Sequence, residues 1–138
     1  MKTARAWAGT IAAAASALVV LAPAATAAPN AATLSITGAV VAANDTVNVD
    51  VTYTCDAGYA GTLVGYVNDT TASAFGVSND TAATCDGASH TAVLSVDNEN
   101  EAADYKAGDS AVVAVSLDAT KAGSPDQNAA QDVTRTLG

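Results

Sequence analysis

The pair Ser89-His90 combines two residue types that suggest hydrolytic chemistry, and His90 is the only histidine in the sequence. In a serine hydrolase the imidazole takes the hydroxyl proton, so the two side chains must lie within hydrogen-bonding distance. Neighbouring residues on a strand point to opposite faces of a sheet, so these two cannot pair with each other. A Gly-x-Ser-x-Gly elbow is also missing. We therefore expect His90 to pack beside a disulfide with one ring nitrogen hydrogen-bonded, and we expect no catalytic residues.

A second cluster, between Asp97 and Asp104, alternates acidic and amide side chains whose oxygens could bind calcium. A calcium loop needs glycine at its sixth position, where Ala102 stands, and glutamate at its twelfth, where Gly108 stands. We expect a mobile, solvated loop, with a weak extracellular calcium site as the alternative. Carboxylate pairs elsewhere could serve a glycosidase, but 14 acidic residues in a short chain make such pairs inevitable.

Cys55 and Cys85 are the two cysteines of the sequence, and they allow one pairing. A zinc site built from cysteine and histidine would lack ligands, because the sequence has one histidine. No basic residue lies near either cysteine in sequence to create a reactive thiolate. We expect a structural disulfide that ties a strand end to a neighbouring loop, and we expect no metal and no cofactor.

The elements that must position these residues are short strands. A half-buried strand with one wet face is predicted where apolar and polar residues alternate: Val47, Val49, Val51, Tyr53 and Cys55 against Asn48, Asp50, Thr52 and Thr54. Upstream, the spacing over 33–41 predicts a strand with a bulge at Gly38. Asn44-Asp45 is predicted to form the turn between the two strands.

Six further strands are predicted, over 61–67, 72–77, 81–85, 90–96, 111–117 and 131–137. Turn signals separate several of them: Asp56-Ala57-Gly58, Asn68-Asp69, Asn79-Asp80 and a hairpin at Asp86-Gly87. The almost continuous apolar run 111–117 suits a central strand, and 118–128 is predicted to be a loop. This pattern predicts an all-β fold, an antiparallel two-sheet immunoglobulin-like sandwich of seven or eight strands, with a closed barrel as the alternative.

Residues 1–27 have the three parts of a secretory signal peptide. A basic start precedes an uncharged apolar stretch and a pair of small residues at the cleavage site: Lys2 and Arg5, then 8–21, then Ala25-Thr26-Ala27. The apolar stretch, about 14 residues, is shorter than the roughly 20 that span a membrane. We expect a secreted, extracellular protein whose mature domain is 28–138, with an uncleaved membrane anchor as the alternative.

The mature domain would keep three basic and all 14 acidic residues, a net charge of −11. Such a charge repels phosphate groups, so we expect no nucleic-acid partner and no association with an anionic membrane after cleavage. The only tryptophan, Trp7, would leave with the signal peptide, and Arg135 would be the one arginine that stays. Residues that dominate tight protein interfaces are therefore scarce.

Four short motifs carry a resemblance to a known family: Thr52-Tyr53-Thr54-Cys55, Cys85-Asp86-Gly87-Ala88-Ser89-His90, Tyr105-Lys106-Ala107-Gly108 and Gln131-Asp132-Val133. On these, the stretch from Cys55 to Leu137 resembles a family of small secreted actinobacterial immunoglobulin-like domains of unknown function. The resemblance implies secretion, the disulfide and the sandwich, and it implies no known activity. Tyr105 is a candidate for the tyrosine that braces the corner between two strands in such domains.

We expect a non-catalytic extracellular binding or surface module, whose partner is an extracellular protein or a glycan. The alternative is a secreted inhibitor or effector acting on an extracellular enzyme. The exposed Trp-Arg-Tyr triplet of small amylase inhibitors is absent from the sequence. Five mature aromatic residues and many alanines also give little support for the deep apolar groove of a chromoprotein carrier.

Overall fold

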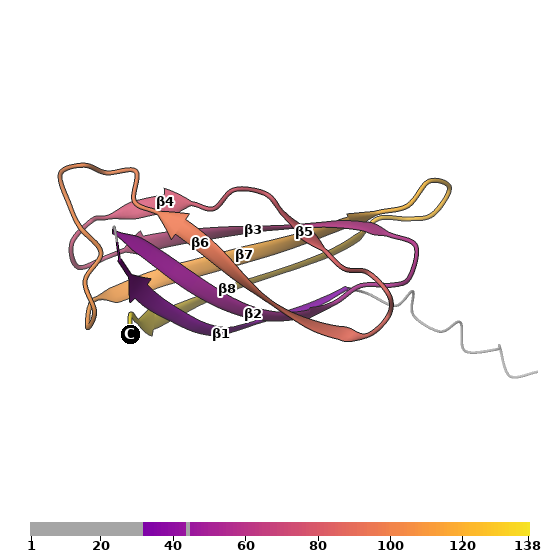
Figure 1. Ribbon diagram of the computed structural model, residues 1–138, viewed down its shortest axis with the longest axis horizontal. Helices are drawn as coiled ribbons and strands as arrows, with labels where there is room; N and C mark the ends of the chain where they lie inside the picture. The colour runs from indigo at the N-terminus through magenta and orange to yellow at the C-terminus, as the bar shows by residue number, and fades with distance from the viewer. Residues whose placement is uncertain (1–31, 44) are drawn as a thin grey trace, which may run out of the picture.

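The computed structural model describes residues 32–43 and 45–138. Within these residues the chain forms eight β-strands, joined by turns and loops, and no helix. Figure 1 shows the strands in two layers. The predicted signal peptide and Asn44 lie outside the described residues. The strands are β1 (Thr33–Ala42), β2 (Thr46–Thr54), β3 (Ala60–Asp69), β4 (Phe75–Val77), β5 (Thr81–Ala83), β6 (Ser89–Asp97), β7 (Ser110–Thr120) and β8 (Gln127–Thr136).

The strands form two antiparallel sheets, which confirms the predicted sandwich. One sheet has the order β1-β2-β6, and the other the order β4-β3-β7-β8 with β5 also paired to β3. The orders β1-β2-β6 and β3-β7-β8 resemble those of an immunoglobulin-type sandwich, but β5 pairs with β3 and not with β6. At one side the C-terminal Gly138 exchanges two backbone hydrogen bonds of 3.0 Å with Ala39 and Val41 of β1. This contact is a short bridge and not a continuous ladder, so the fold is a sandwich and not a closed barrel.

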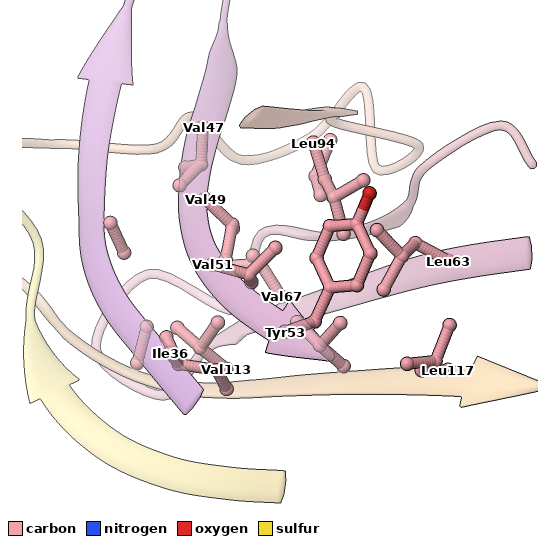
Figure 2. Close-up of a cluster of buried hydrophobic side chains, with 14 of the residues drawn as sticks. Ile36, Val47, Val49, Val51, Tyr53, Leu63, Val67, Leu94, Val113 and Leu117 are labelled. Atoms are coloured by element: carbon pink, nitrogen blue, oxygen red, sulfur yellow. The ribbon is translucent and has the colours of Figure 1, made fainter. Parts of the chain in front are cut away.

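The alternation predicted for β2 places its apolar side chains between the sheets. Val47, Val49, Val51 and Tyr53 are at most 4% exposed. Figure 2 shows them directed at Leu63 and Val67 of β3 and at Val113 and Leu117 of β7. Burial of each such side chain stabilises the fold by about 1.5–3 kcal/mol. A one-residue slip would expose the whole set, so this pattern also fixes the register of β2.

The disulfide between Cys55 and Cys85 is formed, as predicted, and it joins the two sheets. Cys55 follows β2 and Cys85 follows β5, with 4.7 Å between their Cα atoms. A Cβ on Gly61 of β3 would lie 2.8 Å from the Cys85 sulfur, so the glycine leaves room for the bond. Disulfides are typical of oxidising compartments. Within 32–43 and 45–138 no helix is long and apolar enough to cross a membrane.

The first four strands follow the prediction apart from the turn after β3. The bulge in β1 falls between Ile36 and Gly38, as predicted. Asn68 and Asp69, however, belong to β3, and the turn lies after them. The Asp69 carboxylate accepts hydrogen bonds from the backbone of Thr71 and Ala72, which moves the turn forward and shortens β4 to Phe75–Val77.

Two predictions in the second half were wrong in detail. The turn at Asp86-Gly87 exists, with φ +83 at Gly87, but it is not a hairpin because it connects β5 of one sheet to β6 of the other. The predicted loop 118–128 is shorter, because residues at both of its ends pair across β7 and β8, among them Asp118 with Asn128. The run 111–117 does occupy the predicted central place, between β3 and β8.

Candidate functional site: the outer face of the five-stranded sheet

The side of the five-stranded sheet that faces away from the core carries apolar side chains in neighbouring register positions. Tyr66 of β3 pairs with Val77 of β4 on one side and with Ala114 of β7 on the other. Two residues further along β3, Asn68 pairs with Phe75 of β4. Tyr66, Phe75 and Val77 are 37%, 40% and 46% exposed. We call this surface the apolar face; it comprises Val64, Tyr66, Phe75, Val77, Val112, Ala114 and Ala130.

An open groove of about 260 Å³ crosses the apolar face at the middle of β3, β7 and β8. Tyr66 stands on one side of it and Asp132 on the other, and Ala114 forms part of its floor, since the three residues are consecutive register partners. The small side chains of Ala114, Ser116 and Ala130 leave the space of the groove unfilled. The groove is lined by Val64, Gly65, Tyr66, Ala114, Val115, Ser116, Ala130, Gln131 and Asp132.

The charges on the outward positions of this sheet are all negative. Asp132 lines the groove, and Asp118 lies two residues beyond Ser116 on the same side of β7. The basic residues of the described chain lie elsewhere. Lys106 is in the connection between β6 and β7, Lys121 lies 5.7 Å from the ring centre of Tyr59, and Arg135 is on the inward side of β8 with Nη1 buried.

The edge strand β4, which carries Phe75 and Val77, is held in place by the connection between β6 and β7. The Phe75 carbonyl accepts a 2.8 Å hydrogen bond from Glu99 N–H, and Phe75 N–H donates to the Asn98 side chain at 3.3 Å. Gly76 packs against the end of β6, where an added Cβ would lie 1.9 Å from the Asp97 carbonyl oxygen. The position of the apolar face at this edge therefore depends on residues of the neighbouring loop.

That loop is the acidic cluster 97–104, and its amide side chains are structural. Asn98 donates to the Asp45 carboxylate and to the Ala103 carbonyl, and Asn100 donates to the Ser73 carbonyl at 2.9 Å. The predicted mobile, solvated loop is thus tied to β4 and to the β1–β2 turn. Its acidic residues alternate with these anchors and are exposed. Among the described residues, no three acidic, cysteine or histidine side chains gather where they could hold a metal ion.

His90 is in the hydrogen-bonded setting that the sequence predicted. Its Nε2 lies 2.7 Å from Asp86 Oδ1, and its ring centre lies 5.9 Å from that of Tyr53. The hydrogen bond with His90, followed by one from Ala88 N–H, lowers the pKa of Asp86. Ser89 pairs with Thr54 on the outer surface, on the opposite side of β6 from His90. The arrangement braces the chain beside the disulfide.

A third group of polar residues lies at the end of the sandwich where β3 stops and β7 begins. Asp69 is fully buried, and its Oδ2 has no hydrogen-bond partner in the structure. Asp69 and Arg135 are the register partners of Ala111 on its two sides, and Arg135 Nη1 is likewise buried without a partner. Burial, and then the neighbouring carboxylate of Asp69, raise the pKa of Asp109.

Tyr105 does not brace a local corner, which corrects the role for which its position made it a candidate. Its hydroxyl donates to the Val67 carbonyl at 3.3 Å, 38 residues away on β3, and its backbone N–H donates to Asp45 Oδ1 at 2.6 Å. Burial raises the pKa of the Tyr105 phenol. Tyr105 thus anchors the β6–β7 connection to the five-stranded sheet.

Sequence reasoning did not single out the apolar face. The signal was present in 61–67 and 111–117, where apolar residues occupy both alternating positions of the strand. Such a strand has two apolar sides, and a sandwich of two sheets covers one of them. The aromatic and alanine content gave little support for a deep apolar groove, and the structure has an open groove on this uncovered side. No model of a known protein family matches the chain, and no curated protein matches it in sequence.

Proposed function

We propose that the protein is a secreted, non-catalytic binding module that engages an extracellular partner through its apolar face. The observation that carries the proposal is the clustering of three large exposed apolar side chains, Tyr66, Phe75 and Val77, on one face, where Tyr66 also lines the groove. Contiguous exposed apolar surface on a small soluble domain is typical of interaction sites. Tyrosine in particular is enriched among the residues that dominate binding energy.

Secretion is part of this proposal and has its own support. Residues 1–27 have the pattern of a signal peptide, and the formed disulfide fits an oxidising compartment. We include in the proposal the resemblance to small secreted actinobacterial domains, which rests on the sequence motifs. N-terminal sequencing of the exported protein is expected to begin at Ala28.

An enzymatic role is not part of the proposal. The one histidine has its Nε2 engaged by Asp86, and Ser89 faces the other way. The groove is lined by Val, Ala, Gly and Tyr residues together with Ser116, Gln131 and Asp132, so it offers a surface for apolar contact and few groups that could transfer a proton.

Affinity capture from culture supernatant tests the proposal. The tagged mature protein is compared with a double variant, Tyr66→Ser with Val77→Ser, and with a matched control, Val40→Ser with Val93→Ser, on the other sheet. We expect the captured partner to be lost with the first pair and retained with the second, because the control valines are 48% and 56% exposed but lie outside the apolar face. Equal capture by all three proteins would contradict the proposal.

A further inference from the structure

We propose that the partner of the apolar face is a basic amphipathic polypeptide segment, whose apolar side chains enter the groove while its Lys or Arg side chains face Asp132 and Asp118. This inference rests on the proposed function and specifies the chemistry of the partner. Three properties of the face support it: the sign of its charges, the size of its groove and its extent.

The charges favour a cationic partner. Asp132 lines the groove itself, and no outward position of β3, β4, β7 or β8 holds a lysine or arginine. The whole chain carries a net charge of −9, so the long-range field also attracts cations. Complementary charges at the rim of an apolar site chiefly increase the association rate and exclude wrong partners.

The same charges argue against a second copy of this chain as the occupant. A symmetric dimer through the apolar face would bring Asp132 and Asp118 towards the same carboxylates of the other copy, with no basic residue of the face to pair with them. Like charges brought together at an interface are unfavourable. We therefore expect the protein to remain a monomer at concentrations where it binds the partner.

The groove suits a polypeptide better than a small molecule. Pockets that enclose small ligands have volumes of roughly 300–1,000 Å³ and surround most of the ligand. This groove measures about 260 Å³ and is open along one side, so it accommodates an inserted side chain and does not enclose a separate molecule.

The extent of the face agrees with a modest protein interface. The strands β3, β7 and β8 have 10, 11 and 10 residues and β4 has 3. At roughly 4.8 Å between strands and roughly 3.3 Å per residue, they give a flat area of about 500 Å². Stable interfaces bury about 800 Å² on each partner, and transient ones bury less. The face therefore has room for one short segment and its flanking surface.

Peptide titration followed by NMR and fluorescence anisotropy tests the inference. The probes are a short labelled peptide of alternating Leu and Lys, one of alternating Leu and Glu, and one of alternating Ser and Lys. We expect the Leu/Lys peptide to shift the amide signals of Val64, Tyr66 and Ala114, and to bind more weakly at high salt. The Leu/Glu peptide should not bind, because its charges repel the face, and the Ser/Lys peptide should bind much more weakly.

Variants separate the apolar from the electrostatic contribution. Tyr66→Ser should reduce affinity for the Leu/Lys peptide about tenfold or more. Asp132→Asn should reduce it about threefold, as expected for one exposed charge pair. Asp126→Asn makes the same charge change in the exposed β7–β8 connection and should leave affinity unchanged. Thermal melts of each variant establish that it is folded.

The outcomes distinguish this inference from the function on which it rests. Equal binding of Leu/Glu and Leu/Lys peptides at the face, or indifference to Asp132→Asn, would overturn the cationic partner and leave the face as a binding surface. Concentration-dependent dimerisation that shifts the same amides would overturn it in favour of a second copy. Binding spread evenly over both sheets would overturn it as well.

Discussion

The two outer surfaces of this sandwich differ in whether their side chains satisfy one another. On the three-stranded sheet, hydroxyl and amide groups pair across the strands: Thr33 with Thr54 at 2.6 Å, and Ser95 with Asn48 at 3.0 Å. At its far end Thr46 donates to Asp97 at 2.7 Å. We call this surface the hydroxyl face. The seven residues of the apolar face form no such side-chain hydrogen bonds in the structure, and Tyr66, Phe75 and Val77 among them are exposed.

The difference indicates which of the two faces would bind the proposed partner. Covering a polar surface with a second protein yields little net free energy when its hydroxyl groups are already hydrogen-bonded to each other and to water. An exposed apolar surface gains free energy in proportion to the area covered, at about 25 cal/mol per Å². The hydroxyl face has isolated valines, Val40 and Val93, which are normal on any soluble protein.

The largest predicted effect concerns the bond that joins the two sheets. Replacing both Cys55 and Cys85 by alanine, or reducing the bond, should lower the free energy of unfolding by roughly 2–5 kcal/mol. The bond ties the end of β2 to the segment after β5. Its loss should therefore disturb the structure of the hydroxyl face and of the apolar face together. Urea denaturation with and without reductant measures the effect. Identical midpoints would show that the sheets hold together without the bond.

A smaller loss of stability should come from a substitution that disturbs the apolar face and leaves the hydroxyl face intact. Gly76→Ala places a Cβ against the Asp97 carbonyl, so β4 must move away from β6, and we expect a loss of about 1–3 kcal/mol. NMR should show shifted signals around Phe75 and Val77 and little change in the pairing of β1 with β2. Binding to the apolar face should weaken in parallel.

A matched glycine controls for the effect of backbone conformation alone. Gly123 has φ +75 with no atom within 4 Å of an added Cβ. Gly123→Ala should therefore cost about 1 kcal/mol through the left-handed conformation and leave the apolar face unchanged. Equal effects of the two substitutions would mean that contact between β4 and β6 does not position the face.

The smallest predicted effect is a pH dependence at the end of the five-stranded sheet. Burial and contact with Asp69 raise the pKa of Asp109 above its ordinary value of 3.8, so the protonated form is favoured in the folded state. Its contribution to stability is complete below that ordinary value and is lost as the pH rises through the folded-state pKa.

Asp109→Asn tests this pH dependence. The variant should gain stability relative to the native chain as pH rises from below 4 towards neutral. The difference between the two denaturation series isolates Asp109 from Asp86, whose lowered pKa acts in the opposite direction. A difference that does not change with pH would contradict the assignment.

The sequence predicted the fold because its strongest patterns are local. Alternation in β2, the apolar run of β7 and the single cysteine pair are each visible within a few residues, and all three were confirmed. The hairpin predicted at Asp86-Gly87 was wrong, because a turn sequence does not reveal whether the strands on its two sides pair with each other. The apolar face was missed because it depends on pairing among distant strands: Val77, Tyr66 and Ala114 become neighbours only through register.

Site-specific photo-crosslinking compares the two faces most directly. A photoreactive amino acid is placed at Tyr66 in one version of the protein and at Val93 in the other. Both positions are exposed, and they lie on opposite sheets. We predict covalent adducts with a partner from the culture supernatant at Tyr66 and none above background at Val93. Adducts at Val93 equal to or stronger than those at Tyr66 would contradict the assignment of binding to the apolar face.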